Sequence, residues 1–240
     1  MKRSSIVYFL AIVANVMSMT DGENVTARQE LKIFGVGFKK TATESLLNAY
    51  ERLGLGRACD EVCRSRAAAV WSGSWKTGER RLGGVLRVAQ AHDFFQDSPW
   101  CDAAAPLYPA LSQAFPRARF VLTVRPTEQW WSSVFHWLTC VKPDKRREYS
   151  QLLGVSDVDE KAFTAAYERH NANVIKFFGD QPERLLVVDL TDPNATSPWA
   201  QLCRFFRVTT DCPTGALPHR HNQHKKMPHA PPSACRGKPG

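Results

Sequence analysis

Residues 33–46 combine an apolar run, two glycines, two lysines and a series of hydroxyl side chains. An apolar strand brings the chain to the edge of a sheet, and glycine lets the backbone approach a ligand closely. The unpaired N–H groups of the helix that follows would point at a bound anion. Lys40 adds a positive charge there, and Thr41, Thr43 and Ser45 add hydroxyl donors. This stretch therefore predicts a phosphate-binding loop.

The loop is not a Walker A motif, because that motif has Gly directly before its Lys and Lys39 stands in that place. No Walker B strand ending in a magnesium-binding Asp follows it either. A magnesium-dependent phosphate-loop kinase or nucleotide hydrolase stays open as an alternative class, but the sequence favours it less.

A second candidate element begins at residues 119–124, which are typical of a buried strand and lead directly into Arg125. In an open α/β sheet, a residue at the carboxyl end of a strand lies on the ligand-binding edge. Ser133 follows eight residues later, two turns into the next expected helix, and is within reach of the same edge. The two elements therefore predict one shared anion site.

Together, these elements resemble the two phosphate-binding elements of sulfotransferases. The 5′-phosphosulfate loop of those enzymes reads roughly K/R-S/T-G-T-x-S, and Lys40, Thr41, Thr43 and Ser45 fill four of its positions. Ala42 stands where they usually have Gly, and it can replace Gly without strain only if its φ is negative.

The 3′-phosphate element of one sulfotransferase branch reads close to F-P-x-A-x-F-I-L-T-V-R-D-P-x-x-W-x-x-S. Residues 115–133 follow it, with Trp130 at the matching spacing and Pro126 where that branch usually has Asp. Weaker matches continue in the same order at a D-x-P, a W-x-x-L-C-x-F-L and a closing F-P-H-x-N with one residue extra. The resemblance covers residues 31–222 and implies a P-loop-like sulfotransferase fold.

The resemblance also implies the donor, 3′-phosphoadenosine 5′-phosphosulfate, and the roles of the residues that would act on it. Lys40 would stabilise charge on the bridging oxygen, and Asp97, in the D-x-P match, would be the general base, with His92 as the fallback. This chemistry requires no metal. The implied donor-binding set is Lys39, Lys40, Thr41, Ala42, Thr43, Glu44, Ser45, Arg125 and Ser133.

The wider pattern predicts a three-layer α/β domain over residues 31–215, with a central, mostly parallel sheet and helices on both faces. Helical spacing over Thr43–Leu53, stopped by Gly54, and over Asp159–Phe178 supplies two of the helices. The residues between 142 and 160 are polar and loop-like. Strand-like runs lie at 31–36, 85–91, 119–124 and 185–189.

The ends of the chain differ from this domain in composition. Residues 1–20 have a basic start and a short apolar run, which predicts a signal peptide or an uncleaved signal anchor, and residues 21–30 form a linker. Residues 216–240 form a basic, His- and Pro-rich tail, which we expect to be poorly ordered. With two sequons and seven cysteines, some of which should pair in an oxidising compartment, the sequence predicts a lumenal glycoprotein of the secretory pathway, typically the Golgi.

Among 240 residues, 43% are hydrophobic and 23% charged, which is typical of one globular domain. The net charge of +9 suits an anionic nucleotide and an anionic acceptor such as a glycan. No aromatic-rich basic patch or nucleic-acid-binding module is recognisable. The acceptor, a glycan or a small molecule, is not encoded in a transferable motif. Ala42, Glu44 and Pro126 leave a non-catalytic binding protein of the same fold as a further alternative.

Overall fold

The computed structural model describes residues 31–77, 82–192 and 197–218. The predicted leader and linker, both sequons and most of the predicted tail lie outside these residues. The elements, in chain order, are β1 (Ile33–Gly35), α2 (Thr43–Arg52), α3 (Glu61–Thr77), α4 (Leu82–Gln90), β2 (Phe94–Phe95), α5 (Tyr108–Ala114), β3 (Arg119–Val124), α6 (Thr127–His136), a π-helical turn η2 (Trp137–Val141), a 3₁₀ turn η3 (Pro143–Lys145), α7 (Arg146–Leu153), α8 (Glu160–Phe178), β4 (Leu185–Asp189) and α9 (Pro198–Phe206).

These strands form one parallel sheet in the order β2-β1-β3-β4. In the register, Ile33 of β1 pairs with Phe94 on one side and with Arg119 on the other, and Val124 at the end of β3 pairs with Asp189. Because all the strands are parallel, their carboxyl ends meet at one edge of the sheet, where ligands of open α/β proteins bind.

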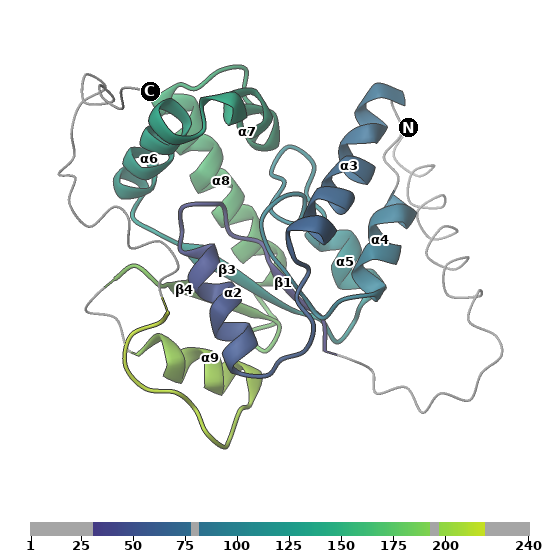
Figure 1. The fold of residues 1–240 in the computed structure, drawn as a ribbon, viewed down its shortest axis with the longest axis vertical. Helices are drawn as coiled ribbons and strands as arrows, with labels where there is room; N and C mark the ends of the chain where they lie inside the picture. Colours follow the sequence, from purple (N-terminus) through teal and green to yellow (C-terminus); the bar gives the residue numbers. More distant parts are fainter. Residues whose placement is uncertain (1–30, 78–81, 193–196, 219–240) are drawn as a thin grey trace, which may run out of the picture.

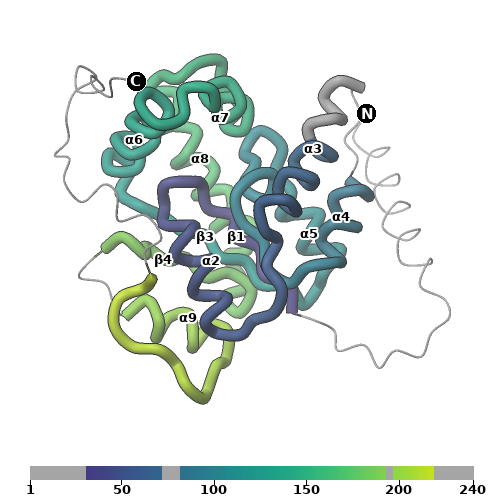
Figure 2. The backbone as a smooth tube through the Cα atoms, in the orientation of Figure 1, coloured from purple at the N-terminus to yellow at the C-terminus, as the bar shows by residue number. Residues whose placement is uncertain are grey.

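Helices cover both faces of the sheet, as the alternation of side chains along each strand requires. Phe34 and Phe120 point into a core formed with α3, α4, α5 and α8, whereas Ile33 and Val121 point into a second core formed with α2 and α9. Figures 1 and 2 show α2 crossing in front of the strands, with α3 and α4 side by side. The predicted three-layer α/β architecture is confirmed.

A third core lies beyond the carboxyl edge of the sheet. It packs Phe38 of the loop after β1 against α6, α7 and α8, through buried aromatic rings that include Trp130 and Tyr167. This core therefore supports the loop that the sequence analysis selected as the phosphate site.

Three of the four predicted strands are present, but the prediction of a strand over residues 85–91 is wrong. That segment belongs to α4, and the strand at this place is the short β2. Val85, Leu86 and Ala89 are the buried residues of α4, a spacing that places them on one helical face. Short buried helices and buried strands share this apolar composition, so the sequence alone does not distinguish them here.

The interpretation of residues 142–160 as loop-like is also wrong in part, because α7 lies within it. Tyr149, Leu152 and Leu153 are buried on one face of α7, and the helix ends at Gly154, which has a φ of 72°. The helix predicted next is present as α8, and the carboxylate of Asp159 caps it by accepting from the N–H of Ala162 at 2.8 Å.

Candidate active site

The loop between β1 and α2 is held against β3 by a close backbone approach at Gly37. A Cβ atom at this position would lie 2.2 Å from Thr123 Oγ1 and 2.5 Å from the Thr123 carbonyl oxygen, so only glycine fits. The Thr41 hydroxyl is also committed to this contact, within 2.6 Å of Thr123 Oγ1 and 2.5 Å of the Phe38 carbonyl oxygen. Thr41 is fully buried and therefore supports the loop from inside.

The N-terminus of α2 has no side-chain cap. Ala42 occupies the N-cap position, and its carbonyl accepts the first helical bond, from the N–H of Leu46, at 3.1 Å. The N–H groups of the first turn therefore have no partner within the helix, which is the arrangement that binds anions. Thr43 and Ser45 are buried beside this opening.

Ala42 has a φ of 67°, and Lys40 before it has a φ of 74°. The condition of a negative φ at Ala42 is therefore not met, and the loop keeps a left-handed conformation that glycine would adopt freely. For a residue with a Cβ this conformation costs about 1–2 kcal/mol. The backbone of the loop is thus specified by its surroundings and not by the local preference of alanine.

Arg125 lies at the carboxyl end of β3, beside the loop. Its guanidinium donates to the Lys40 carbonyl at 3.4 Å, and its main-chain N–H donates to the Tyr167 hydroxyl at 2.8 Å. Burial lowers the pKa of Arg125, while the nearby Asp189 carboxylate at the end of β4 opposes this change. The side chain is half-buried and therefore well placed to gain from contact with an anion.

A pocket of about 870 Å³ opens at this edge of the sheet. It brings together every residue of the predicted site except Thr41. Its lining residues are Lys39, Lys40, Ala42, Thr43, Glu44, Ser45, Asp97, Arg125, Ser133, Trp137, Leu190, Thr191, Asp192, Pro198, Gly215, Ala216 and Leu217.

The two lysines of the pocket share an aromatic neighbour. The ammonium nitrogens of Lys39 and Lys40 lie 5.6 Å and 5.9 Å from the centroid of the Trp137 ring, within the range of a cation–π contact. Burial lowers the pKa of Lys40, and the positive charges of Arg125 and Lys39 lower it further. An anion in the pocket would relieve this concentration of positive charge.

Asp97 also lines the pocket, just after β2, and has a φ of 62°. Its side chain is only 7% exposed, and Oδ2 accepts from Arg64 Nη1 at 3.3 Å. The same guanidinium nitrogen lies 3.8 Å from Glu44 Oε1, and Nη2 donates to Glu61 at 2.6 Å. Arg64 belongs to α3 and was not recognised in the sequence analysis.

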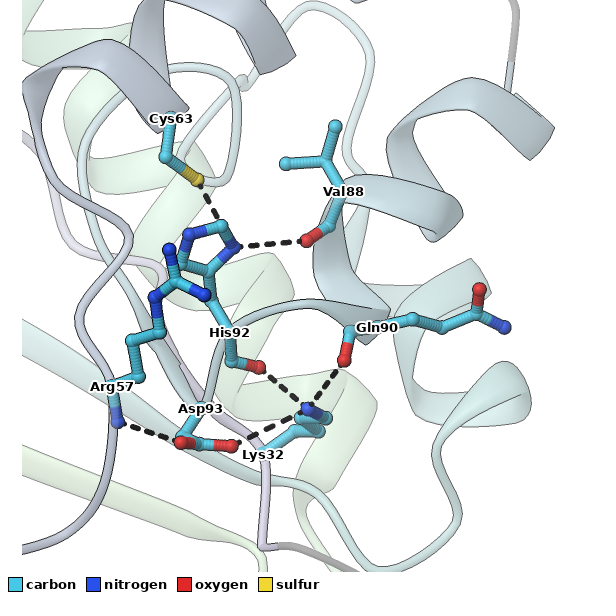
Figure 3. Close-up of polar contacts among 7 residues, drawn as sticks. All are labelled: Lys32, Arg57, Cys63, Val88, Gln90, His92 and Asp93. Carbon is cyan, nitrogen blue, oxygen red and sulfur yellow. Dashed lines mark hydrogen bonds and ion pairs between the residues drawn. The ribbon is translucent and has the colours of Figure 1, made fainter.

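His92, the fallback general base, lies away from this group. Its Nδ1 is 3.3 Å from the Val88 carbonyl and 3.5 Å from Cys63 Sγ (Figure 3). The chain around it is fixed by Lys32, whose ammonium donates to the His92 carbonyl at 2.6 Å and pairs with Asp93. His92 is absent from the residues that line the pocket, so Asp97 is the stronger candidate for the base.

The sulfotransferase domain family matches residues 32–156 and 145–227, which together cover most of the chain. The chain belongs to the sulfotransferase domain family. No match was found among curated proteins. The resemblance seen in the loop motifs is therefore confirmed at the level of the whole domain, and the fold described above is that of a sulfotransferase enzyme.

The sequence predictions do not include the pocket-lining residues Thr191, Asp192, Gly215 and Ala216. Thr191 and Asp192 lie two and three residues after the end of β4, so the rule that selected Arg125 at the end of β3 would have found them. Gly215 and Ala216 come from the segment after α9 and carry no motif, whereas Leu217 begins the weak match to the closing F-P-H-x-N. The disulfide between Cys203 and Cys212 fastens that segment to α9.

The prediction that some cysteines pair is confirmed by this disulfide and by a second one between Cys59 and Cys63, whereas Cys101 is buried as a free thiol. Within residues 31–77, 82–192 and 197–218, no group of three or more potential metal ligands is found. The helices of the same residues include none that is long and apolar enough to cross a bilayer.

Proposed function

We propose that this sulfotransferase moves a sulfuryl group from 3′-phosphoadenosine 5′-phosphosulfate to a hydroxyl or amine of an acceptor. The observation that carries the proposal is the convergence of two anion-binding elements on one pocket. One is the uncapped start of α2 with Lys40, and the other is Arg125 with Ser133. A nucleotide with phosphates at both its 5′ and 3′ positions suits this pair of elements.

The residues present fit the two phosphates by charge and by hydrogen-bonding capacity. The first-turn N–H groups of α2 and the hydroxyls of Thr43 and Ser45 would hold the 5′-phosphate, and Lys40 would face its bridging oxygen. Arg125 and Ser133 would hold the 3′-phosphate, for which a guanidinium offers two parallel donors. Lys39 would add positive charge at the same wall, where Glu44 is already balanced by Arg64.

The reaction breaks the bond between sulfur and the bridging oxygen and forms a bond between sulfur and the acceptor atom. Asp97 would take the proton that the acceptor loses, and the nucleotide would leave as 3′-phosphoadenosine 5′-phosphate. Negative charge grows on the bridging oxygen as that bond breaks. Lys40 would stabilise this charge, which makes it more important in the transition state than in the ground state.

Calorimetric titration of the folded domain with 3′-phosphoadenosine 5′-phosphate tests the donor assignment. We expect binding with the same affinity with and without magnesium, and no comparable binding of ATP. Magnesium-dependent binding of ATP, with no response to the bisphosphate, would overturn the proposal and favour the kinase or hydrolase class instead. Transfer from a sulfur-labelled donor to panels of glycans and small molecules would then identify the acceptor.

We further propose that the enzyme works in the lumen of the secretory pathway, in the Golgi, either anchored or secreted, on a glycan or small-molecule acceptor. The basic apolar start of the chain, its sequons and the Cys59–Cys63 and Cys203–Cys212 disulfides support this location. Expression in animal cells should give a mobility shift that an endoglycosidase removes. Unglycosylated protein spread through the cytosol would contradict the proposal.

A further inference from the structure

Arg64 is the residue at which three carboxylates of the site region converge. Its Nη1 lies 3.3 Å from Asp97 Oδ2 and 3.8 Å from Glu44 Oε1, and its Nη2 lies 2.6 Å from Glu61 Oε2. The Arg64 side chain is only 14% exposed. Burial alone would lower its pKa, but the carboxylates of Asp97, Glu61 and Glu44 outweigh this effect and raise the pKa above its ordinary value. The guanidinium is therefore held as a cation.

The pairing matters most for Asp97, because the carboxylate has few other contacts. In the described part of the chain, Oδ1 of Asp97 is buried and has no hydrogen-bond partner, so Arg64 alone holds this side chain through Oδ2. A buried carboxylate fixed at one oxygen keeps its orientation while the other oxygen stays uncommitted. That is the arrangement required of a base that must meet an acceptor proton in one geometry.

Arg64 also pairs with Glu44, and there its positive charge has a different effect. It lies in the first turn of α2 and lines the pocket, so its negative charge stands beside the place proposed for the 5′-phosphate. Two negative charges in that place repel each other, and the attraction of a nearby cation to both offsets this repulsion. Arg64 supplies that cation from outside the loop.

Several contacts fix the start of α3, so Arg64 projects from a rigid part of the backbone. The Cys59–Cys63 disulfide spans the first turn, and the Asp60 carboxylate accepts from the N–H of Cys63 at 2.9 Å. The N–H of Cys59 donates to the carbonyl of Phe94 in β2 at 2.9 Å. The position of Arg64 is thereby tied to the strand that leads to Asp97.

We propose that Arg64 is a positioning residue for sulfuryl transfer. It orients the Asp97 carboxylate toward the acceptor and neutralises Glu44 beside the 5′-phosphate, so that one guanidinium serves both the base and the donor loop. The proposal rests on the proposed function, because the roles of Asp97 and of the loop come from it. An Arg that only stabilised the fold would change melting temperature without separating turnover from nucleotide affinity.

The test compares Arg64→Met and Arg64→Lys with Arg66→Met, an exposed arginine on the same helix. Nucleotide affinity is measured with 3′-phosphoadenosine 5′-phosphate. Turnover is measured as release of that bisphosphate from the phosphosulfate donor with water as the acceptor, which needs no identified acceptor. Melting temperatures check that each variant is folded, and wild type is titrated first.

For Arg64→Met we expect turnover to fall about 100-fold, since a displaced reacting group costs on that order. Bisphosphate affinity should fall roughly tenfold, which corresponds to about 1.4 kcal/mol, because Arg64 no longer offsets the repulsion between Glu44 and the 5′-phosphate. Adding Glu44→Gln to Arg64→Met should restore the affinity but leave turnover low. Arg64→Lys should keep near-normal affinity with reduced turnover, because an ammonium lacks the planar fork of donors. Arg66→Met should match wild type.

Three results would overturn the proposal. Wild-type turnover in Arg64→Lys together with wild-type turnover in a folded Arg64→Met would remove the link to Asp97. Recovery of turnover as well as affinity on adding Glu44→Gln would leave only a charge effect on the donor loop. Failure of wild type itself to bind the bisphosphate would instead reject the proposed donor, and with it this role of Arg64. If Arg64→Met does not fold, Arg64→Lys decides between these outcomes.

Discussion

The indole N–H of Trp130 donates to the main-chain carbonyl of Lys39 at 3.1 Å. This bond joins the helix that carries Ser133 to the loop that carries Lys40, so the two candidate phosphate-binding elements are connected directly. Trp130 is fully buried and stacks on Tyr167 at 4.2 Å, and the Tyr149 hydroxyl approaches the same carbonyl at 3.4 Å. The distance between the elements is therefore set by a packed aromatic cluster.

Trp130→Phe keeps an aromatic ring but removes the donor to Lys39. We expect a loss of about 1–3 kcal/mol in the free energy of unfolding, because the Lys39 carbonyl loses the indole donor and the smaller ring leaves space in the core. Bisphosphate affinity should fall as the loop loosens. Chemical denaturation and calorimetry measure the two effects. Trp131→Phe, a half-buried neighbour in α6, is the control and should leave the affinity unchanged.

Ala42→Gly should stabilise the protein, because Ala42 has a φ of 67° that glycine adopts without a Cβ clash. We expect the free energy of unfolding to rise by about 0.5–1 kcal/mol. This net gain is the relief of strain minus the entropic cost of ordering glycine, which is more flexible in the unfolded chain. Denaturant titration measures it. Ala49→Gly, in the buried interior of α2, should destabilise by about 1 kcal/mol or more. Equal effects of the two substitutions would contradict the assigned backbone strain.

The sequence predicts helices and strands well where the residue pattern is clear. It predicts them less well in short apolar segments, where packing in the core decides between helix and strand. Residues 119–124 and 185–189 form strands with the predicted bounds, because β-branched and apolar residues run between clear breaks. The buried face of α4 has too few apolar residues to show a helical period, so its sequence is also compatible with a strand.

The candidate site was predictable where it follows from chain order and not where it depends on distant packing. Lys40 and Arg125 each follow a strand, so the rule for parallel sheets places them at one edge. Arg64 carries no motif, and its contact with Asp97 spans 33 residues between α3 and the turn after β2. The Thr41 side chain points inward because it contacts Thr123, and the sequence gives no sign of this contact either.

Arg125→Ala and Lys40→Ala should affect different steps. Arg125 would contact a phosphate already present in the ground state, so its loss should cost about 1.5–3 kcal/mol of bisphosphate binding. Lys40 would act mainly on charge that develops during transfer, so its loss should lower turnover more than affinity. Calorimetry and single-turnover kinetics separate the two, with the exposed Lys161→Ala as control. Normal turnover in Lys40→Ala would make Lys39 the next candidate.

Stability should fall at acidic pH partly because of His170 in α8. Its Nε2–H donates to the Val36 carbonyl at 2.8 Å, and burial lowers its pKa below 6.5. Below pH 6.5, the unfolded chain therefore binds a proton at this histidine more readily than the folded protein does. The free energy of unfolding falls as the pH drops below 6.5, by at most about 1.4 kcal/mol per pH unit. His170→Gln should make the melting temperature depend less on pH. The measurement covers about pH 7.5 to pH 5, the range in which histidine titrates. His136→Gln, at a half-buried position, is the control, and an unchanged acid dependence in His170→Gln would show that other groups cause it.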